Sequence, residues 1–128
     1  MTLPIHFGTD GWRGVIADTF TFSNLRRVAS ATARYMTDHP NRGPKRILVG
    51  YDRRFLSLAF AREAAYVFRS AGHDVRVASA PIPTPAVSAC VKASAAAWGI
   101  MITASHNPAH YNGFKIKDAQ GRSAPPEV

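Results

Sequence analysis

The stretch that decides the fold is Trp98–Pro108, WGIMITASHNP. Residues 98–103 are almost entirely apolar, which predicts a strand buried on both faces, as in a parallel sheet. The polar segment SHNP follows almost at once. Ligands of parallel α/β sheets bind at the carboxyl ends of the strands. The sequence therefore predicts that the chemistry of this protein lies in the loop after residue 103.

On the N-terminal side of this stretch, apolar runs alternate with amphipathic segments. The pattern predicts helices over residues 23–38 and 57–71 and from residue 84 onward, and strands over residues 47–51, 75–78 and 98–103. Ser23 is the expected N-cap of the first helix, and Gly72 suits a left-handed cap after the second. Because the strands are apolar throughout rather than alternating, we expect an α/β fold with three layers, a mostly parallel sheet with helices on both faces.

Three further segments carry local expectations. The glycine-rich stretch 6–14, HFGTDGWRG, is predicted to be a loop. Cys90 falls on the apolar face of the third helix and is expected in the core. Residues 123–127 resemble the opening turn of a helix. From this last pattern we expect the chain to be part of a longer protein.

Composition and charge limit the class of protein. The 128 residues carry 16 Lys and Arg against 8 Asp and Glu, a formal charge of +8, and 46% are hydrophobic. These values fit one folded domain, residues 1–128, that handles anions. The cations are scattered, and neither interleaved aromatics nor a reading helix indicates nucleic-acid binding. A single cysteine, no apolar run of about 18 residues and no signal peptide predict a cytoplasmic protein without disulfides or a membrane span.

Ser105 is the nucleophilic side chain in the loop after the buried strand. His106 is adjacent and Lys115 lies ten residues on, so that a base and a cation could help the hydroxyl to attack or accept a phosphoryl group. Adjacent Ser and His residues cannot form a Ser-His-Asp triad merely by being neighbours. The alternative is that Ser105 or Asn107 only caps a turn, a common use of these residue types.

Two cations beside glycines are candidate phosphate ligands. In Asn112-Gly113-Phe114-Lys115, the glycine permits a close backbone approach and the lysine could bind phosphate or exchange a proton; a hairpin turn with a solvated lysine is the alternative. Arg13, between two glycines, could hold a phosphate through both arms of its guanidinium, or form a structural salt bridge. Asp52, Arg53 and Arg54 follow a predicted strand and are interpreted as surface or scaffold charges.

Four segments together resemble the first domain of the α-D-phosphohexomutases, the phosphoglucomutase and phosphomannomutase family. They are FGTDGWRG at 7–14, VGYDRR at 49–54, TASHNP at 103–108 and NGFKIK at 112–117, in the family's order. The combination of TASHNP after an apolar strand with NGFK is the most specific of these signals. The resemblance covers nearly the whole chain, from Phe7 to about Lys117.

The resemblance implies a function residue by residue. Ser105 matches the family's phosphorylated serine, which gives its phosphoryl group to a sugar hydroxyl; the bisphosphorylated sugar turns over and returns its other phosphoryl group. Phosphate thus moves between the 1- and 6-positions of a hexose. Arg13 matches an arginine near the phosphoserine. His106, Asn107 and Lys115 match its phosphate-binding neighbours, and Lys115 is a candidate for proton exchange with the sugar hydroxyl.

The resemblance also implies partners that this chain lacks. The family has four domains around a cleft and uses magnesium, held by the phosphate on Ser105 and by three aspartates of an acidic loop; no such loop occurs here. Hexose 1,6-bisphosphate is the implied intermediate and activator. We therefore expect a domain that is nearly inactive alone, and glucose or mannose phosphates as substrates of the whole enzyme. A stand-alone module that binds phosphosugars or protein partners without turnover is the alternative.

Overall fold

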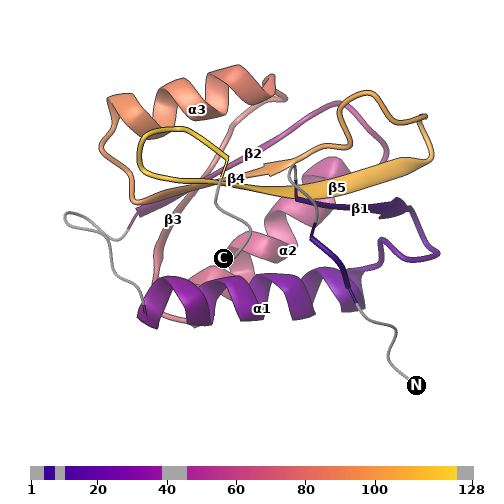
Figure 1. Ribbon diagram of the computed structural model, residues 1–128, viewed down its shortest axis with the longest axis horizontal. Helices are drawn as coiled ribbons and strands as arrows, with labels where there is room; N and C mark the ends of the chain where they lie inside the picture. Colours follow the sequence, from indigo (N-terminus) through magenta and orange to yellow (C-terminus); the bar gives the residue numbers. More distant parts are fainter. Residues whose placement is uncertain (1–4, 8–10, 39–45, 124–128) are drawn as a thin grey trace.

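The computed structural model describes residues 5–7, 11–38 and 46–123. These residues form one five-stranded sheet, in the order β1-β5-β4-β2-β3, and three helices (Figure 1). The elements are β1 Trp12–Val15, α1 Phe22–Asp38, β2 Arg46–Tyr51, α2 Ser57–Ser70, β3 Asp74–Val77, α3 Thr84–Ala93, β4 Trp98–Ile102 and β5 Tyr111–Lys117.

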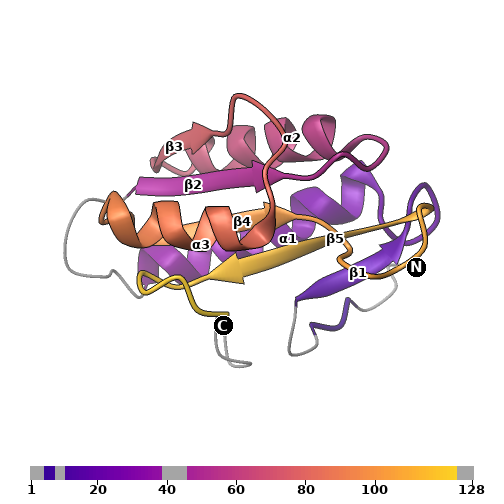
Figure 2. The same ribbon diagram turned by 90° about the horizontal axis from the view of Figure 1, so that it is seen from above.

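Helices cover both faces of the sheet. Helices α1 and α2 lie on one face and α3 lies on the other (Figures 1 and 2). The predicted three-layer α/β arrangement is therefore confirmed. The sheet itself is mixed: β2 runs parallel to β3 and β4, whereas β5 runs antiparallel to both β4 and β1. The short connection from β4 to β5 explains this direction, because a parallel neighbour would need a crossover of about a dozen residues or more.

The larger core lies between the sheet and helices α1 and α2. Three aromatic rings in contact link β1 to α2 at its centre. The Trp12 ring stacks on Phe20 with 4.4 Å between the ring centroids, and Phe20 packs edge-to-face on Phe60 with 4.8 Å between them. All three side chains are buried. Because successive side chains of a strand alternate between the faces, burying Trp12 on this side directs its neighbour Arg13 to the opposite side.

A smaller core lies under α3. Val87 and Val91 of this helix, one turn apart, pack with Ala96 and Met101. Cys90 is exposed, so the prediction that it belongs to the core is wrong. The physical reason is that α3 buries only the narrow stripe of the two valines, and Cys90 lies at its flank.

Two local predictions at the ends of the elements need correction, and a third is left untested. Within the stretch predicted as a loop, residues 12–14 belong to strand β1, which pairs with β5 about 100 residues later; residues 8–10 lie outside the described part. The N-cap of α1 is Thr21 rather than Ser23, since the Thr21 hydroxyl accepts the amide N–H of Asn24 at 3.1 Å. Ser123 pairs with Lys117 in an isolated bridge. The helix predicted after it falls outside the described residues.

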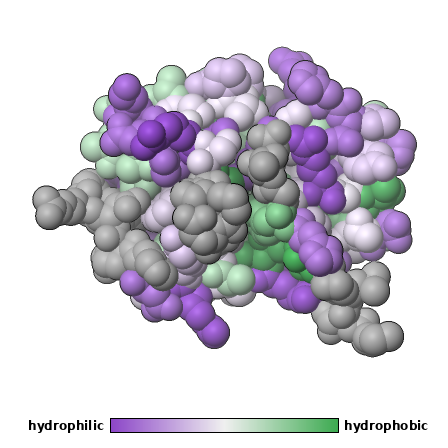
Figure 3. All heavy atoms as spheres, in the orientation of Figure 1, coloured by the Kyte–Doolittle hydropathy of each residue, from purple (hydrophilic) through white to green (hydrophobic). Residues whose placement is uncertain are grey.

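The surface is largely hydrophilic, with a hydrophobic area in the middle of the face shown in Figure 3. On the described residues, an apolar groove of about 320 Å³ lies between α1 and β5; its lining includes Phe7, Val28, Tyr35 and Ile116. Among the described helices, none combines the length and the apolar character needed to cross a membrane.

Candidate functional site

The loop that joins β4 to β5 lies at the carboxyl ends of the parallel strands. Strands β2 and β4 are paired in register up to Tyr51 and Ile102. The pairing continues one step further, because the Asp52 amide donates to the carbonyl of Ile102 at 3.2 Å. The segment after β2 and the loop after β4 therefore leave the sheet side by side. This is the edge at which the sequence predicted the chemistry.

Ser105 sits in this loop in an unusual backbone conformation. Its φ is 53°, in the left-handed region that residues with a Cβ rarely adopt. The Ser105 amide donates to the Thr103 hydroxyl at 3.1 Å. The side chain is half-buried, and the Lys115 ammonium donates to the Ser105 hydroxyl with an Nζ–Oγ distance of 2.6 Å. The hydroxyl is thus held beside a fixed positive charge.

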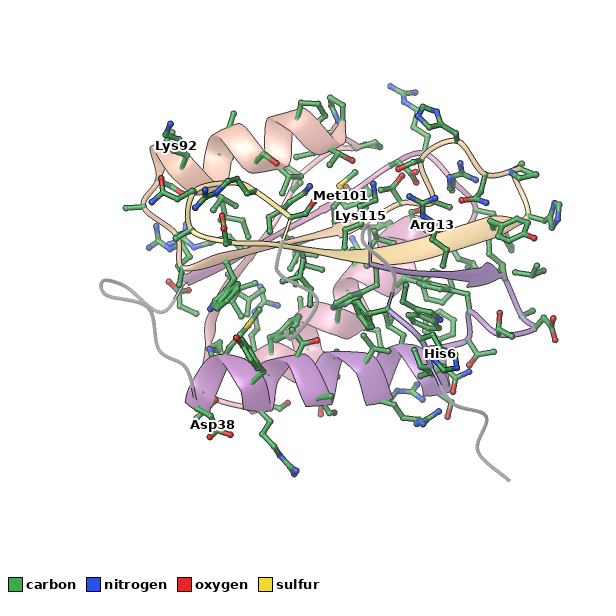
Figure 4. All side chains as sticks on the ribbon, in the orientation of Figure 1. His6, Arg13, Asp38, Lys92, Met101 and Lys115 are labelled. Carbon is green, nitrogen blue, oxygen red and sulfur yellow. The ribbon has the colours of Figure 1, made fainter. Side chains whose placement is uncertain are left out.

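Lys115 and Arg13 reach the loop from the two antiparallel strands. Both side chains lie on the α3 side of the sheet, beyond the part that this helix covers (Figure 4). Arg13 Nη1 donates to Asn107 Oδ1 at 3.0 Å. Lys115 is the fifth of the seven residues of β5, opposite Met101 in the register with β4. The structure therefore brings Ser105, Asn107, Arg13 and Lys115 together, as the sequence predicted.

Gly113 makes the close approach of these strands possible. It lies opposite Arg13 in the β1–β5 register. A Cβ on Gly113 would lie 2.4 Å from the carbonyl oxygen of Thr103 and 2.9 Å from that of Trp12. The close backbone approach expected at this glycine is confirmed. The hairpin alternative is wrong, because residues 112 and 113 lie inside β5.

The sequence interpretation missed how Arg54 and Asp52 build the loop. The Arg54 guanidinium donates to four backbone carbonyls of residues 105–111, at distances of 2.7 to 3.2 Å. Its Nε lies 3.2 Å from Oδ2 of Asp52. Asp52 also accepts the hydroxyl of Thr103 at 2.6 Å and that of Ser57 at 2.7 Å. These contacts support the interpretation of Asp52 and Arg54 as scaffold charges, and the scaffold that they form contacts the loop that carries Ser105.

A buried amide completes this support. The Asn112 side chain is fully buried, and its Nδ2 donates to the Ser57 hydroxyl at 2.9 Å. Its Oδ1 accepts the amide of Gly113 at 2.9 Å. Because Ser57 in turn donates to Asp52, the chain of hydrogen bonds runs from β5 through the start of α2 to the segment after β2. An asparagine in a strand next to a glycine was the only sequence signal for it.

Two other predicted features of the site, the His106 side chain and the magnesium ligands, are not part of this cluster. His106 lies on the same loop with an exposed side chain. Within the described ranges, no group of three or more His, Cys, Asp or Glu side chains could hold a metal ion. Asp52, which follows β2, is already paired with Arg54 and accepts the hydroxyls of Ser57 and Thr103. These residues alone do not form a site suited to magnesium, which prefers several oxygen ligands.

The geometry defines an anion site built around a hydroxyl. A phosphoryl group on Ser105 would carry about −1.5 to −2 charges at neutral pH. It would meet the Lys115 ammonium directly, and the Arg13 guanidinium is held next to the same loop through Asn107. The fold and this cluster therefore define an α/β domain in which a serine hydroxyl lies among cationic side chains at the carboxyl ends of the parallel strands.

Comparison with known proteins names the family. The family model for "Phosphoglucomutase/phosphomannomutase, alpha/beta/alpha domain I" matches residues 4–128, and the chain belongs to this family. A phosphoglucosamine mutase of Thioalkalivibrio sulfidiphilus is 38% identical over 124 residues, covering 96% of this chain and 27% of the relative. A phosphoglucosamine mutase of Maricaulis maris is 38% identical over 118 residues, covering 91% of this chain and 26% of the relative.

Solved structures agree with this assignment. A protein of Thermus thermophilus assigned as a phosphomannomutase superimposes with a TM-score of 0.92 at 46% identity, covering 99% of this chain and 28% of that one. The Paramecium phosphoglucomutase parafusin, at 23% identity and a TM-score of 0.77, covers 95% of this chain and 23% of its own and shares the fold. The chain thus spans about a quarter of the length of its relatives.

Proposed function

We propose that Ser105 carries the phosphoryl group that a phosphohexomutase exchanges with its sugar. In this proposal, phosphate moves between the 1- and 6-positions of a hexose through a hexose 1,6-bisphosphate. The observation that carries the proposal is the 2.6 Å contact between the Lys115 ammonium and the Ser105 hydroxyl, in a domain of this family. A serine that only capped a turn would not need a lysine directed at its oxygen from another strand.

The chemical step follows from this contact. The phosphorus–Oγ bond of phosphorylated Ser105 breaks as a bond from the sugar hydroxyl to phosphorus forms. The proton of the sugar hydroxyl has to leave, and the Ser105 oxygen has to gain one. Lys115, within hydrogen-bond reach of that oxygen, donates a proton to it. The Lys115 amine then takes up the proton of the sugar hydroxyl. After the bisphosphate turns over, the reverse step restores the phosphoserine.

The neighbouring groups hold the charge of the phosphoryl group in this proposal. Arg13 and Lys115 face its oxygens, while Asn107 fixes the arginine. His106, exposed on the loop, would contact the bound sugar phosphate. In this proposal the phosphate on Ser105 would be one ligand of a magnesium ion, and the aspartate ligands would lie outside this chain. The ion neutralises phosphoryl oxygens when bound.

The substrate is proposed as a class, hexose phosphates. The sequence favoured glucose or mannose phosphate, and the Thermus thermophilus structure is assigned as a phosphomannomutase. The curated relatives described above are phosphoglucosamine mutases, so the comparisons do not support one sugar over another. In the four-domain family pattern, sugar recognition lies in later domains. We therefore expect the 128-residue chain alone to show almost no turnover.

Two substitutions test the proposal in the full-length protein. Ser105→Ala removes the phosphoryl acceptor, so mutase activity should fall to background and incubation with hexose 1,6-bisphosphate should add no phosphoryl mass. Lys115→Met should lower kcat by about 10²- to 10⁴-fold, the usual contribution of a general acid–base group. Activity is followed by a coupled assay, and phosphorylation by intact mass.

Matched controls are available on the same domain. Ser94→Ala alters a serine whose hydroxyl donates to the Cys90 carbonyl at the end of α3, and Lys117→Met alters the next lysine on β5. Both should keep normal turnover. Normal turnover in the Ser105→Ala variant would contradict the proposal. Binding of hexose phosphate without turnover by the full-length wild type would favour a binding module instead.

A further inference from the structure

The Arg54 side chain uses both of its Nη groups to hold the serine loop. A guanidinium has five N–H groups, one on Nε and two on each Nη. Nη2 donates to the carbonyls of Ser105 at 2.8 Å and Asn107 at 2.7 Å, and Nη1 to those of Pro108 at 2.7 Å and Tyr111 at 3.2 Å. Nε lies 3.2 Å from Asp52, and the Arg54 side chain is only 14% exposed. The donors of Nη1 and Nη2 are thus engaged by the loop, and Nε faces the Asp52 carboxylate.

We propose that Arg54 is the positioning residue of the phosphoryl-transfer serine, acting through the loop backbone without touching the substrate; this inference rests on the proposed function. All four carbonyls belong to the segment 105–111, which carries Ser105 and joins β4 to β5. Removing the guanidinium would leave these carbonyls without their shared partner. Outside this segment, the contact that would be lost within the described part of the chain is the one to Asp52.

The contacts fix Ser105 from both sides of its own α-carbon. Its carbonyl accepts from Arg54, and its amide donates to the Thr103 hydroxyl. The Thr103 hydroxyl donates its own proton to Asp52, at 2.6 Å, which leaves its oxygen free to accept from Ser105. Asp52 and Arg54 therefore hold the two peptide groups that flank Ser105. These contacts stabilise its left-handed backbone, which a residue with a Cβ adopts only when the surroundings enforce it.

This arrangement makes a specific kinetic prediction. Because the Nη donors of Arg54 are engaged by the loop and its Nε is paired with Asp52, the loss of Arg54 should not weaken the binding of a hexose phosphate. Its loss should instead misplace the Ser105 oxygen relative to Lys115 and the sugar hydroxyl, and a small misplacement can lower turnover by about 10²-fold. Lysine cannot replace arginine here, since an ammonium offers three donors from a single point rather than a planar fork of five.

The experiment compares Arg54→Lys and Arg54→Ala with Arg53→Lys in the full-length protein. Arg53 is the adjacent arginine and is exposed, so Arg53→Lys should match the wild type. Both Arg54 variants should lose about 10²-fold in kcat with KM for the hexose phosphate nearly unchanged. Millimolar methylguanidine should restore part of the activity of Arg54→Ala, whereas methylammonium should not, because only the former reproduces the fork.

A second measurement uses the 128-residue chain and does not depend on catalysis. Amide hydrogen exchange should be faster at Asn107 and Tyr111 in Arg54→Ala than in the wild type, with α1 unchanged as a sign of an intact fold. Unchanged exchange in the loop, full activity of Arg54→Lys, or a rise in KM that accounts for the loss would overturn the positioning role. If the wild type itself shows no mutase activity, the proposed function fails, and the exchange measurement still decides whether Arg54 holds the loop.

Discussion

Replacing Gly113 by alanine should damage both the stability of the domain and its serine site. The new Cβ would lie 2.4 Å from the carbonyl oxygen of Thr103 and 2.9 Å from that of Trp12. Carbon and oxygen atoms normally approach to about 3.3 Å, so the Thr103 carbonyl must retreat by about 1 Å. Both obstacles are backbone, on two different segments, and neither can rotate away.

The expected cost combines two opposing effects. Inserting a methyl group into packed structure costs about 1–3 kcal/mol, while replacing a strand glycine by alanine recovers about 0.5–1 kcal/mol of backbone entropy. The net loss should be about 1–2 kcal/mol. For a domain of this size it corresponds to a melting temperature lowered by about 4–8 °C.

Thermal unfolding of the chain measures the loss of stability. The kcat of the full-length protein measures the damage to the serine site. Gly72→Ala is the matched control: Gly72 has φ +94°, and a Cβ added to it would meet no atom within 4 Å, so alanine there strains the backbone without touching the site. The left-handed strain should cost about 1–2 kcal/mol, comparable to the main variant. Only Gly113→Ala should also lose turnover. An unchanged melting temperature and kcat for Gly113→Ala would refute the reasoning.

Two smaller predictions test corrections made by the structure. Thr21→Ala should lower the free energy of unfolding by about 0.5–2 kcal/mol because it removes the N-cap of α1, while Ser23→Ala should change it little; urea denaturation compares the two, and equal losses would count against the assignment of the cap. Cys90 should react with a water-soluble thiol reagent in the folded chain nearly as fast as in denaturant, and slow labelling that needs unfolding would show that the thiol is buried after all.

The elements that could be predicted from the sequence are those whose pattern is local. The apolar runs at 47–51 and 98–103 became β2 and β4, and the amphipathic stretches became helices, because burial on two faces or on one stripe leaves a direct trace in residue order. Strand β1 left no such trace. It is four residues long, and its partner β5 follows about 100 residues later.

The candidate site divides in the same way. Ser105, Asn107 and Lys115 stand out as reactive or cationic side chains beside a strand end or a glycine, which a sequence shows directly. Arg54 acts on backbone carbonyls, which every residue carries, so no spacing of side chains could reveal its targets. The direction of β5 was equally hidden, since it depends on the length of one loop rather than on hydrophobic pattern.

The pairing of β1 with β5 also sets the order in which the site can assemble during synthesis. Strand β1 is made before β5, which is its only partner strand among the described residues, and Asn107 follows Arg13 by 94 positions in the sequence. The parallel unit β2-α2-β3-α3-β4 needs neither and can form first. Long-range closures of this kind are slow steps of folding. We therefore expect the arginine to join the serine loop last, when β1 docks against β5.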